Sequence, residues 1–238
     1  MFTQRISAAV RRLPLKPGLS LSRCLLCHAG DTGGSGICRP CRTELPALQH
    51  ACSLCALPLA NAGDHLCPRC LQQPPPLAGG HACWFYAYPV AQLIQRFKYQ
   101  GDLAAGRSLA EVAATELEPV GDRPDVLVPI PLHWRRQLSR GYNQAYLIAE
   151  IFARHWRIPL DTRLLRKTAR TGSQSQLKRR QRLKNLSSSF RAGPRVSGLH
   201  IGLVDDVITT GATLEAAAET LLQAGAAEVS AYALARTP

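Results

Sequence analysis

The stretch Leu199–Thr213, with the sequence LHIGLVDDVITTGAT, most strongly constrains the fold of this chain. Its apolar run Ile201–Val204 lacks the alternation of a half-exposed strand, which predicts a strand covered on both faces of a parallel sheet. Asp205 and Asp206 follow, and then come a small hydroxylated loop and an Ala/Leu/Glu-rich helical pattern. The stretch therefore predicts a strand, an acidic edge, a tight loop and a helix.

This order of elements indicates a site for a ribose 5-phosphate, because ligands of parallel sheets bind at the carboxyl ends of the strands. The amides of a glycine-containing loop can converge on a phosphate at a helix N-terminus. Carboxylates suit ribose hydroxyls, or a Mg²⁺ ion that accompanies a diphosphate. Both acids can contribute only if the backbone turns at Asp206, since an extended strand points neighbours to opposite faces. The loop residues are Thr209, Thr210, Gly211, Ala212 and Thr213.

A simpler alternative is that Thr-Thr-Gly is only a turn and that Thr213 caps the helix. Two rival phosphate-binding patterns, G-x-x-x-x-G-K-[ST] and G-x-G-x-x-G, do not occur in the sequence. The stretch resembles the phosphoribosyl-diphosphate (PRPP) motif of type I phosphoribosyltransferases. The resemblance implies that the two acids contact the ribose hydroxyls and that the loop binds the 5-phosphate.

Length and charge narrow the classes of protein further. A chain of 238 residues can form one sizeable domain and a small one, and a net charge of +13 favours anionic partners. No apolar run reaches the ~18 residues of a membrane span. The basic start of the chain lacks the continuous apolar region of a secretory signal, so we expect a cytoplasmic protein without a membrane span.

The cysteines predict two metal sites. Eight of the nine form four C-x-x-C pairs, and a tetrahedral zinc ion needs two such pairs. The pairs can combine sequentially or in an interleaved way, and His28, His50 or His65 could substitute as ligands. Disulfides are the alternative for an oxidising compartment. The remaining Cys83 is expected to be a small buried residue. The predicted zinc ligands are Cys24, Cys27, Cys38, Cys41, Cys52, Cys55, Cys67 and Cys70.

We predict a basic N-terminal segment (1–17), a cysteine-rich zinc-ribbon domain (18–73), a linker (74–82) and a larger domain (83–238). The linker is placed there because QQPPPLAGG, residues 72–80, should break both helix and strand. In the larger domain, hydrophobic periodicity predicts helices at 90–99, 104–117, 145–152 and 213–224. It predicts strands at 84–88, 125–130, 199–204 and 228–235. No role is expected for Arg236, close to the chain end.

Cations follow the predicted strand 125–130, where they could meet a diphosphate. These are Arg135, Arg136 and Arg140, and Lys98 on the helix 90–99 is a further ligand-binding candidate. The alternative for the arginines is solvated surface charge.

The stretch Pro129–Gln144 matches the pattern P-x-P-L-H-x-x-R-x-x-x-R-G-[FY]-N-Q. Together with the cysteine pairs and the acidic motif, it resembles the ComF family, which includes GntX-like proteins. The resemblance implies an α/β chain with a type I phosphoribosyltransferase fold, a mostly parallel sheet flanked by helices, behind a small N-terminal double zinc ribbon. It also implies a role in natural transformation or in the use of imported DNA.

The segment 162–204 has no acidic residue but eleven cations, which need an anionic partner or free solvent. It approximately matches a family pattern through Thr171, Gln174, Leu177, Arg182 and Asn185, and the resemblance implies a hood that closes over PRPP. Alternatively, it could follow a single-stranded DNA backbone or be a solvated loop without a ligand. The nucleic-acid candidates are Lys178, Arg179, Arg180, Arg182 and Lys184.

Two functional hypotheses follow. In the first, a ComF-type protein of competence or DNA utilisation binds PRPP or a related nucleotide with Mg²⁺; catalysis would displace diphosphate at the ribose C1, with Asp205 and Asp206 at the reacting sugar. In the second, a non-catalytic adaptor binds single-stranded DNA, and its zinc domain recruits a translocase or recombination partner. No acceptor-base pocket is identifiable from the sequence, so whether the protein is an enzyme is left open.

Overall fold

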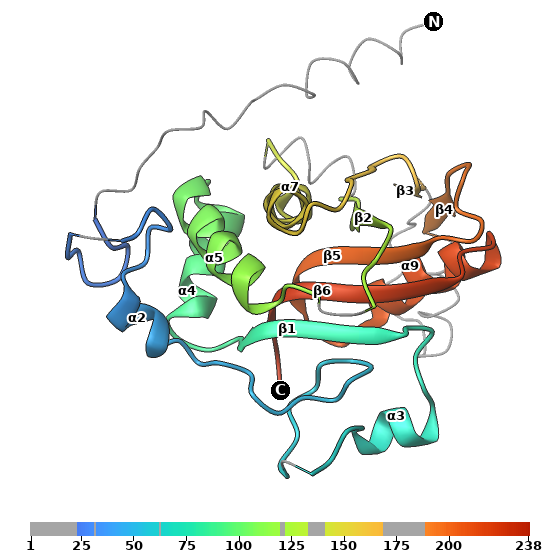
Figure 1. Ribbon diagram of the computed structural model, residues 1–238, viewed down its shortest axis with the longest axis horizontal. Helices are drawn as coiled ribbons and strands as arrows, with labels where there is room; N and C mark the ends of the chain where they lie inside the picture. Colours follow the sequence, from blue (N-terminus) through green and yellow to red (C-terminus); the bar gives the residue numbers. More distant parts are fainter. Residues whose placement is uncertain (1–22, 31, 62, 120–121, 133–140, 169–188) are drawn as a thin grey trace, which may run out of the picture.

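Four strands form one parallel sheet in the order β1-β6-β5-β2 at the centre of the structure, a computed structural model (Figure 1). The structure describes residues 23–30, 32–61, 63–119, 122–132, 141–168 and 189–238. Because all four strands are parallel, their carboxyl ends lie at one edge of the sheet. The strands are β1 (Gly79–Phe85), β2 (Val126–Pro129), β5 (His200–Ile208) and β6 (Glu228–Arg236).

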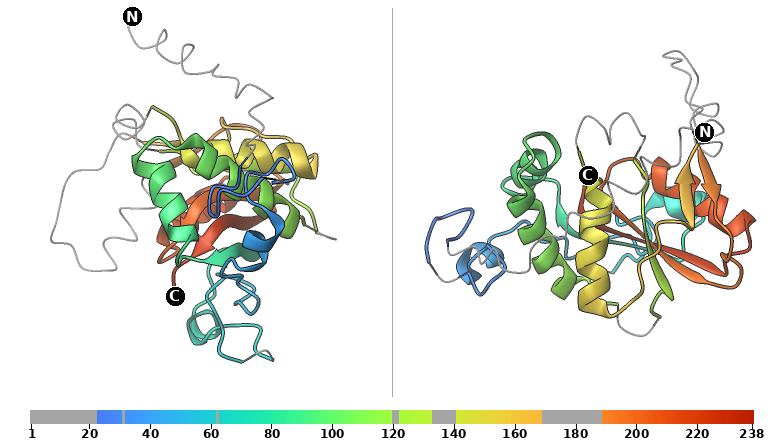
Figure 2. Two further views of the ribbon diagram at one scale, coloured as in Figure 1. Left: turned by 90° about the vertical axis from the view of Figure 1, so that its left-hand side faces the viewer. Right: turned by 90° about the horizontal axis from the view of Figure 1, so that it is seen from above.

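Helices cover both faces of this sheet. The helices α4 (Val90–Tyr99), α5 (Leu103–Glu116) and α7 (Gln144–Trp156) share one hydrophobic core, and α5 and α7 lie side by side (Figures 1 and 2). The helix α9 (Ala212–Gln223) belongs to a second core. The four predicted helices are confirmed, with ends that differ by up to four residues.

The alternation of side chains along the strands separates the two cores. In β2, Leu127 joins the core of α4, α5 and α7, whereas Val126 and Val128 join the core of α9. All three side chains are buried, so the strand has apolar residues at successive positions, as a strand covered on both faces requires. The predicted fold class, a mostly parallel sheet flanked by helices, is confirmed.

A short antiparallel pair lies apart from the main sheet. It consists of β3 (Leu165–Lys167) and β4 (Phe190–Ala192), and Arg166 faces Arg191 in its register. Phe190 opens β4 and is buried. The pair therefore fixes two parts of the basic segment 162–204 against each other.

The two cysteine-rich modules contact different parts of the larger domain. The first contains the helix α2 (Arg39–Thr43), and its Ile37 and Leu45 belong to the same core as α4 and α5. The second contains the helix α3 (Pro68–Gln72), which lies well away from α2 (Figure 1). In the second module the buried cluster consists of the four cysteines, with leucines packed around them. Its order must therefore depend more on a metal than on a core of its own.

The expectation that residues 72–80 break both helix and strand is wrong in part, because α3 extends to Gln72 and β1 begins at Gly79. Gly80 is needed for packing rather than for a break. The amide of Gly80 donates to the carbonyl of Ser53 over 2.8 Å, and a Cβ at Gly80 would lie 2.7 Å from the Leu54 carbonyl oxygen. The second module thus lies directly against the backbone of β1.

In the described part of the chain, no helix combines the length and apolar character that crossing a membrane would require.

Replacing Gly80 by alanine should weaken the contact between β1 and the second module. The added methyl group would overlap the Leu54 carbonyl, and overpacking of this kind costs roughly 1–3 kcal/mol. Denaturant unfolding of the purified protein measures the loss. Gly63→Ala is the matched control, since its Cβ would have no atom within 4 Å; equal stability of the two variants would contradict the packing argument.

Candidate ribose phosphate site

The central strand β5 carries the two acids, and it is longer than predicted. It was expected to end at Val204, with a turn at Asp206 as the condition for both acids to contribute, but it continues to Ile208. The reason is that Val207 and Ile208 are buried and pair with Ala235 and Arg236 of β6, so the ladder extends past the acids. The carboxylates therefore lie on a strand near the carboxyl edge of the sheet, and the loop begins at its end. The strand does not break at Asp206, but Val204 and Val207 both join the core of α4, α5 and α7, so the regular alternation of faces is interrupted across the two acids.

Asp206 is only 9% exposed, and its Oδ1 lies 2.7 Å from Nζ of Lys98. Lys98 projects from the last turn of α4, whose apolar face is buried beside β5. A buried carboxylate needs such a partner, because desolvation disfavours an isolated charge. The structure thus brings together two residues, Lys98 and Asp206, that were predicted to bind the same ligand.

Asp205 has an unusual protonation equilibrium. Its Oδ1 accepts a hydrogen bond from the Asp206 amide over 2.9 Å. Burial, followed by the neighbouring charge of Asp206, raises the pKa of Asp205 to about 7, although that hydrogen bond and the charges of Lys98 and Lys167 oppose the rise. Near neutral pH the Asp205 carboxyl is therefore partly protonated. A cation or hydroxyl ligand bound to the acidic pair would change this protonation.

The loop Thr209–Thr213, here called the phosphate loop, connects β5 to α9. Gly211 is the N-cap residue of α9 and has a φ of +81°, in the left-handed region that favours glycine. Glycine offers no capping side chain, and the Ala212 amide makes only a long 3.4 Å bond to the Thr210 hydroxyl, so the helix N-terminus and its dipole suit an anion. The alternative that Thr213 caps the helix is wrong, because α9 already begins at Ala212.

Two arginines that sequence reasoning missed hold this loop in place. Arg236 is 4% exposed, and its Nη1 donates to the carbonyls of Ile208, over 3.2 Å, and of Thr209. Arg69 of α3 donates from Nη1 to the Thr210 carbonyl over 3.1 Å and pairs with Glu215 of α9. The only signal in the sequence for Arg236 was its position as a cation at the end of an apolar strand. Nothing in the sequence indicated a role for Arg69.

Each cysteine module brings four sulfur atoms within 4.8 Å of one another, one group from the first two pairs and one from the last two. Sequential pairing, one of the two arrangements that the sequence allowed, is therefore the observed one. Amides point at the sulfurs, for example Cys38 N to Cys24 Sγ at 3.5 Å and Cys70 N to Cys67 Sγ at 3.5 Å. Such bonds stabilise thiolates, so both groups fit tetrahedral zinc. The residues are Cys24, Cys27, Cys38 and Cys41 in the first site, and Cys52, Cys55, Cys67 and Cys70 in the second.

Two sets of predicted site residues lie outside the part of the chain that the structure describes. The first set comprises the candidates for a diphosphate, Arg135, Arg136 and Arg140. The second comprises the candidates for nucleic acid, Lys178, Arg179, Arg180, Arg182 and Lys184.

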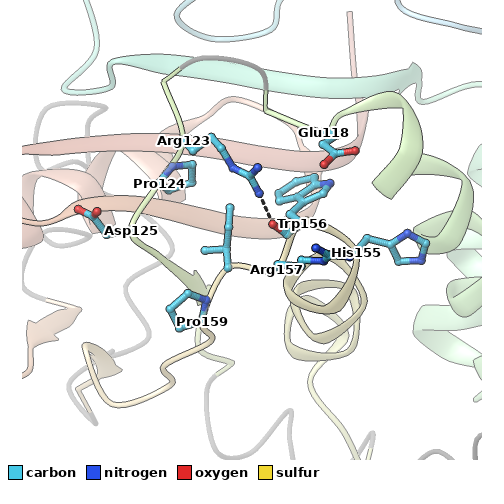
Figure 3. A pocket seen from close by; sticks show the side chains of 9 residues that line it. Glu118, Arg123, Pro124, Asp125, His155, Trp156, Arg157 and Pro159 are labelled. Carbon is cyan, nitrogen blue, oxygen red and sulfur yellow. Dashed lines mark hydrogen bonds between the residues drawn. The ribbon is translucent and has the colours of Figure 1, made fainter.

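An open cavity of about 580 Å³ lies at the edge of the sheet where β2 begins (Figure 3). Asp125, which precedes β2, lines it, and the Arg123 guanidinium donates to the Trp156 carbonyl at its wall. Strands start at this edge, whereas ligands of parallel sheets bind where strands end. The cavity is therefore separate from the predicted ribose phosphate site. Its other lining residues are Glu118, Pro124, His155, Arg157, Ile158 and Pro159.

Comparison with known proteins identifies a domain family for each of the two parts of the chain. Residues 103–238 match the phosphoribosyl transferase domain family, and residues 21–71 match the double zinc ribbon domain. The chain is 30% identical to competence protein F of Haemophilus influenzae, over 90% of this chain and 96% of the relative. It is 32% identical to competence protein ComFC of Bacillus subtilis, over 84% of each. This chain belongs to the ComF family.

Other relatives of this ComF-family chain have related names. The DNA utilization protein YhgH of Escherichia coli K12 is 36% identical over 93% of this chain and 98% of its own length. Among solved structures, glutamine PRPP amidotransferase of B. subtilis is similar with a TM-score of 0.39 and 24% identity, over 52% of this chain and 25% of the enzyme. The two family matches, at residues 103–238 and 21–71, give the chain a type I phosphoribosyltransferase domain and a double zinc ribbon.

Replacing Asp205 by asparagine should stabilise the ligand-free protein at pH 8. The pKa of Asp205 is raised from 3.8 to about 7 in the folded protein, so the folded state binds more protons than the unfolded state between about pH 4 and 7. The free energy of unfolding of the wild type should therefore fall as the pH rises through this window. The variant should lack this slope and be more stable at pH 8 by roughly 1–3 kcal/mol, since one pKa unit corresponds to about 1.4 kcal/mol.

Denaturant unfolding at several pH values between 4 and 8 measures this effect. Glu219→Gln, on the exposed side of α9, is the charge-matched control and should keep the slope of the wild type. The same slope in Asp205→Asn as in the wild type would show that the acidic pair is not strained in this way.

Proposed function

We propose that the phosphate loop and the two acids of β5 bind the ribose 5-phosphate part of PRPP or of a related nucleotide. One observation carries the proposal: the carboxylates of Asp205 and Asp206 stand at the carboxyl edge of the central strand, directly before a helix whose N-cap is a glycine with positive φ. Amides there suit a phosphate, and carboxylates suit the vicinal hydroxyls of the ribose. Membership of the phosphoribosyl transferase domain family supports the same ligand.

In this proposal Lys98 is the counter-ion of Asp206 in the free protein, and Asp205 is partly protonated near pH 7. A Mg²⁺ ion that accompanies a diphosphate fits the pair, because hard cations prefer carboxylate oxygens. Binding of the ion favours the ionised form of Asp205. The affinity for Mg²⁺-PRPP should therefore rise with pH up to about 7 and level off above it.

Turnover at this site would displace diphosphate from C1 of the ribose while the loop and the acids hold the sugar. Arg135, Arg136 and Arg140, which follow β2 in the sequence, are the proposed ligands of the diphosphate. No pocket is assigned to the acceptor base. The proposal is therefore that the site binds the ligand, and that it transfers the phosphoribosyl group only if an acceptor is found. A screen of nucleobases for diphosphate release from PRPP tests the transfer step.

PRPP with Mg²⁺ should raise the melting temperature of the protein. At a ligand concentration of about 100 times Kd the gain is about 2.7 kcal/mol, which corresponds to several degrees for a chain of this size. The double variant Asp205→Asn/Asp206→Asn should lose the rise, whereas Glu219→Gln should keep it. An undiminished rise in the double variant would remove the acids from the ligand site.

A second candidate function is the binding of single-stranded DNA. The observation that favours it is the register of the β3–β4 pair, which places Arg166 directly opposite Arg191, both exposed. Like charges facing each other across strands are unfavourable unless an anion neutralises them. The names of the relatives, which refer to competence and DNA utilization, support a role in the uptake or use of DNA. The adaptor form of this proposal adds a translocase or recombination partner.

Binding of single-stranded DNA should weaken steeply with salt, because each neutralised phosphate contributes about 0.7 to the slope of log K against log salt. The double variant Arg166→Ala/Arg191→Ala, and separately Lys178→Ala/Arg179→Ala/Arg180→Ala, should lower both the affinity and this slope. Arg39→Ala, in the first cysteine module, should change neither. Fluorescence anisotropy with an oligonucleotide measures the affinity, and binding that does not depend on salt would exclude a backbone contact.

Each cysteine site is proposed to hold one structural zinc ion, since four thiolates in a small module without a core of its own match that use. All nine cysteines are free thiols in the structure. A reducing compartment suits such sites, and this is the support for the proposed cytoplasmic location.

A further inference from the structure

The second cysteine site and the phosphate loop are in direct contact, although they lie in different domains. Arg69 stands between two of the metal ligands, Cys67 and Cys70, in the short helix α3. Its guanidinium donates to the carbonyl of Thr210 over 3.1 Å and forms an ion pair with Glu215 in the first turn of α9. A single side chain of the metal module therefore contacts both the loop and the helix that the loop precedes.

A second guanidinium completes the connection from the opposite side. Arg236, the last residue of β6, donates from Nε to the carbonyl of Cys55 over 3.2 Å. Through Nη1 it also donates to the carbonyls of Ile208 and Thr209, where the phosphate loop begins. Nη1 also donates to the Thr237 carbonyl over 2.6 Å, whereas the partner of Nε is the Cys55 carbonyl, so a displacement of the Cys55 turn would leave a buried cation incompletely paired.

Charge gives these contacts a dependence on the metal. Four thiolates around one divalent zinc ion leave the centre with a net negative charge, and Arg69 and Arg236 are cations close to it. Metal also fixes the turn Cys52–Cys55 and the start of α3, since the buried cluster of this module is made of the cysteines themselves. Loss of the metal should therefore release both arginines from their present geometry.

The first cysteine site provides the internal comparison. It packs through Ile37 and Leu45 into the core of α4 and α5, away from α9. Arg39 lies between Cys38 and Cys41, one position earlier in its pair than Arg69 in the second module, and it is exposed. Arg42 bonds within the same module, to the carbonyls of Ile37 and Thr32.

We propose that metal at Cys52, Cys55, Cys67 and Cys70 sets the conformation of the phosphate loop, with Arg69 and Arg236 as positioning residues, so that ligand affinity at the loop is linked to the occupancy of this site and not of the first. The ligand part of the inference rests on the proposed function. Linkage is reciprocal: if the metal favours the binding conformation, then the ligand must raise the affinity of this site for zinc by the same factor.

The experiment starts from full-length protein carrying about two zinc ions and measures zinc affinity by equilibrium competition with a chelator. In the presence of Mg²⁺-PRPP, one of the two sites should bind zinc about 5- to 10-fold more tightly, at the lower end of typical coupling factors, and the other site should not change. Arg69→Ala should abolish the gain, whereas Arg39→Ala should keep it.

A measurement without ligand keeps the inference separate from the proposed function. Hydrogen exchange of the peptide that spans residues 205–216 should be several-fold faster in Arg69→Ala than in the wild type, and unchanged in Arg39→Ala. Partial zinc removal should reproduce the faster exchange in proportion to the loss from the second site. Arg69→Ala leaves all eight cysteines intact, so it avoids the risk that a cysteine variant fails to fold.

The outcomes discriminate between the two proposals. If PRPP does not bind but loop exchange depends on Arg69 and on zinc, the proposed ligand is wrong and the coupling between metal module and loop stands. If PRPP binds equally well to the wild type, to Arg69→Ala and to protein that lacks zinc at the second site, the ligand stands and this inference is overturned. Hydrogen exchange of residues 205–216 that is the same in all variants likewise overturns this inference.

Discussion

The parallel ladder between β5 and β6 runs from His200 opposite Glu228 to Ile208 opposite Arg236. It extends β5 past both acids, and this extension puts Asp206 within reach of Lys98 on α4. At its far end it brings the guanidinium of Arg236 level with the start of the phosphate loop. Backbone pairing therefore determines where the charged groups of the site stand, and the side chains then adjust to one another.

This arrangement of charged groups lowers the stability of the ligand-free protein, as is common at sites that are preorganised for a ligand. Two adjacent carboxyl groups are held in a poorly solvated place, and the pKa of Asp205 rises for that reason. A single lysine balances one of them. A ligand that brings hydroxyls or a divalent cation would relieve this imbalance, which explains how the same residues can disfavour the empty state and favour the bound one.

Local patterns were sufficient for much of the fold. The helix α4 has the predicted ends because Val90, Leu93, Ile94 and Phe97 give an unambiguous apolar face. Patterns failed where tertiary contacts decide. Two aspartates in succession predicted the end of a strand that pairing in fact continues. The contacts of Arg69 with Thr210 and Glu215 join residues far apart in the sequence, so no local pattern could indicate them.

The bond between Arg236 and Cys55 joins residues 181 positions apart in the sequence. During synthesis the second cysteine module is made before β6, so it must exist for an interval without the strand that later holds it. For that interval the module has neither Arg236 nor the loop to rest on, and capturing a metal is the means by which it can keep its shape. The order in which a ribosome delivers the chain thus gives the metal a part in biogenesis as well as in the finished protein.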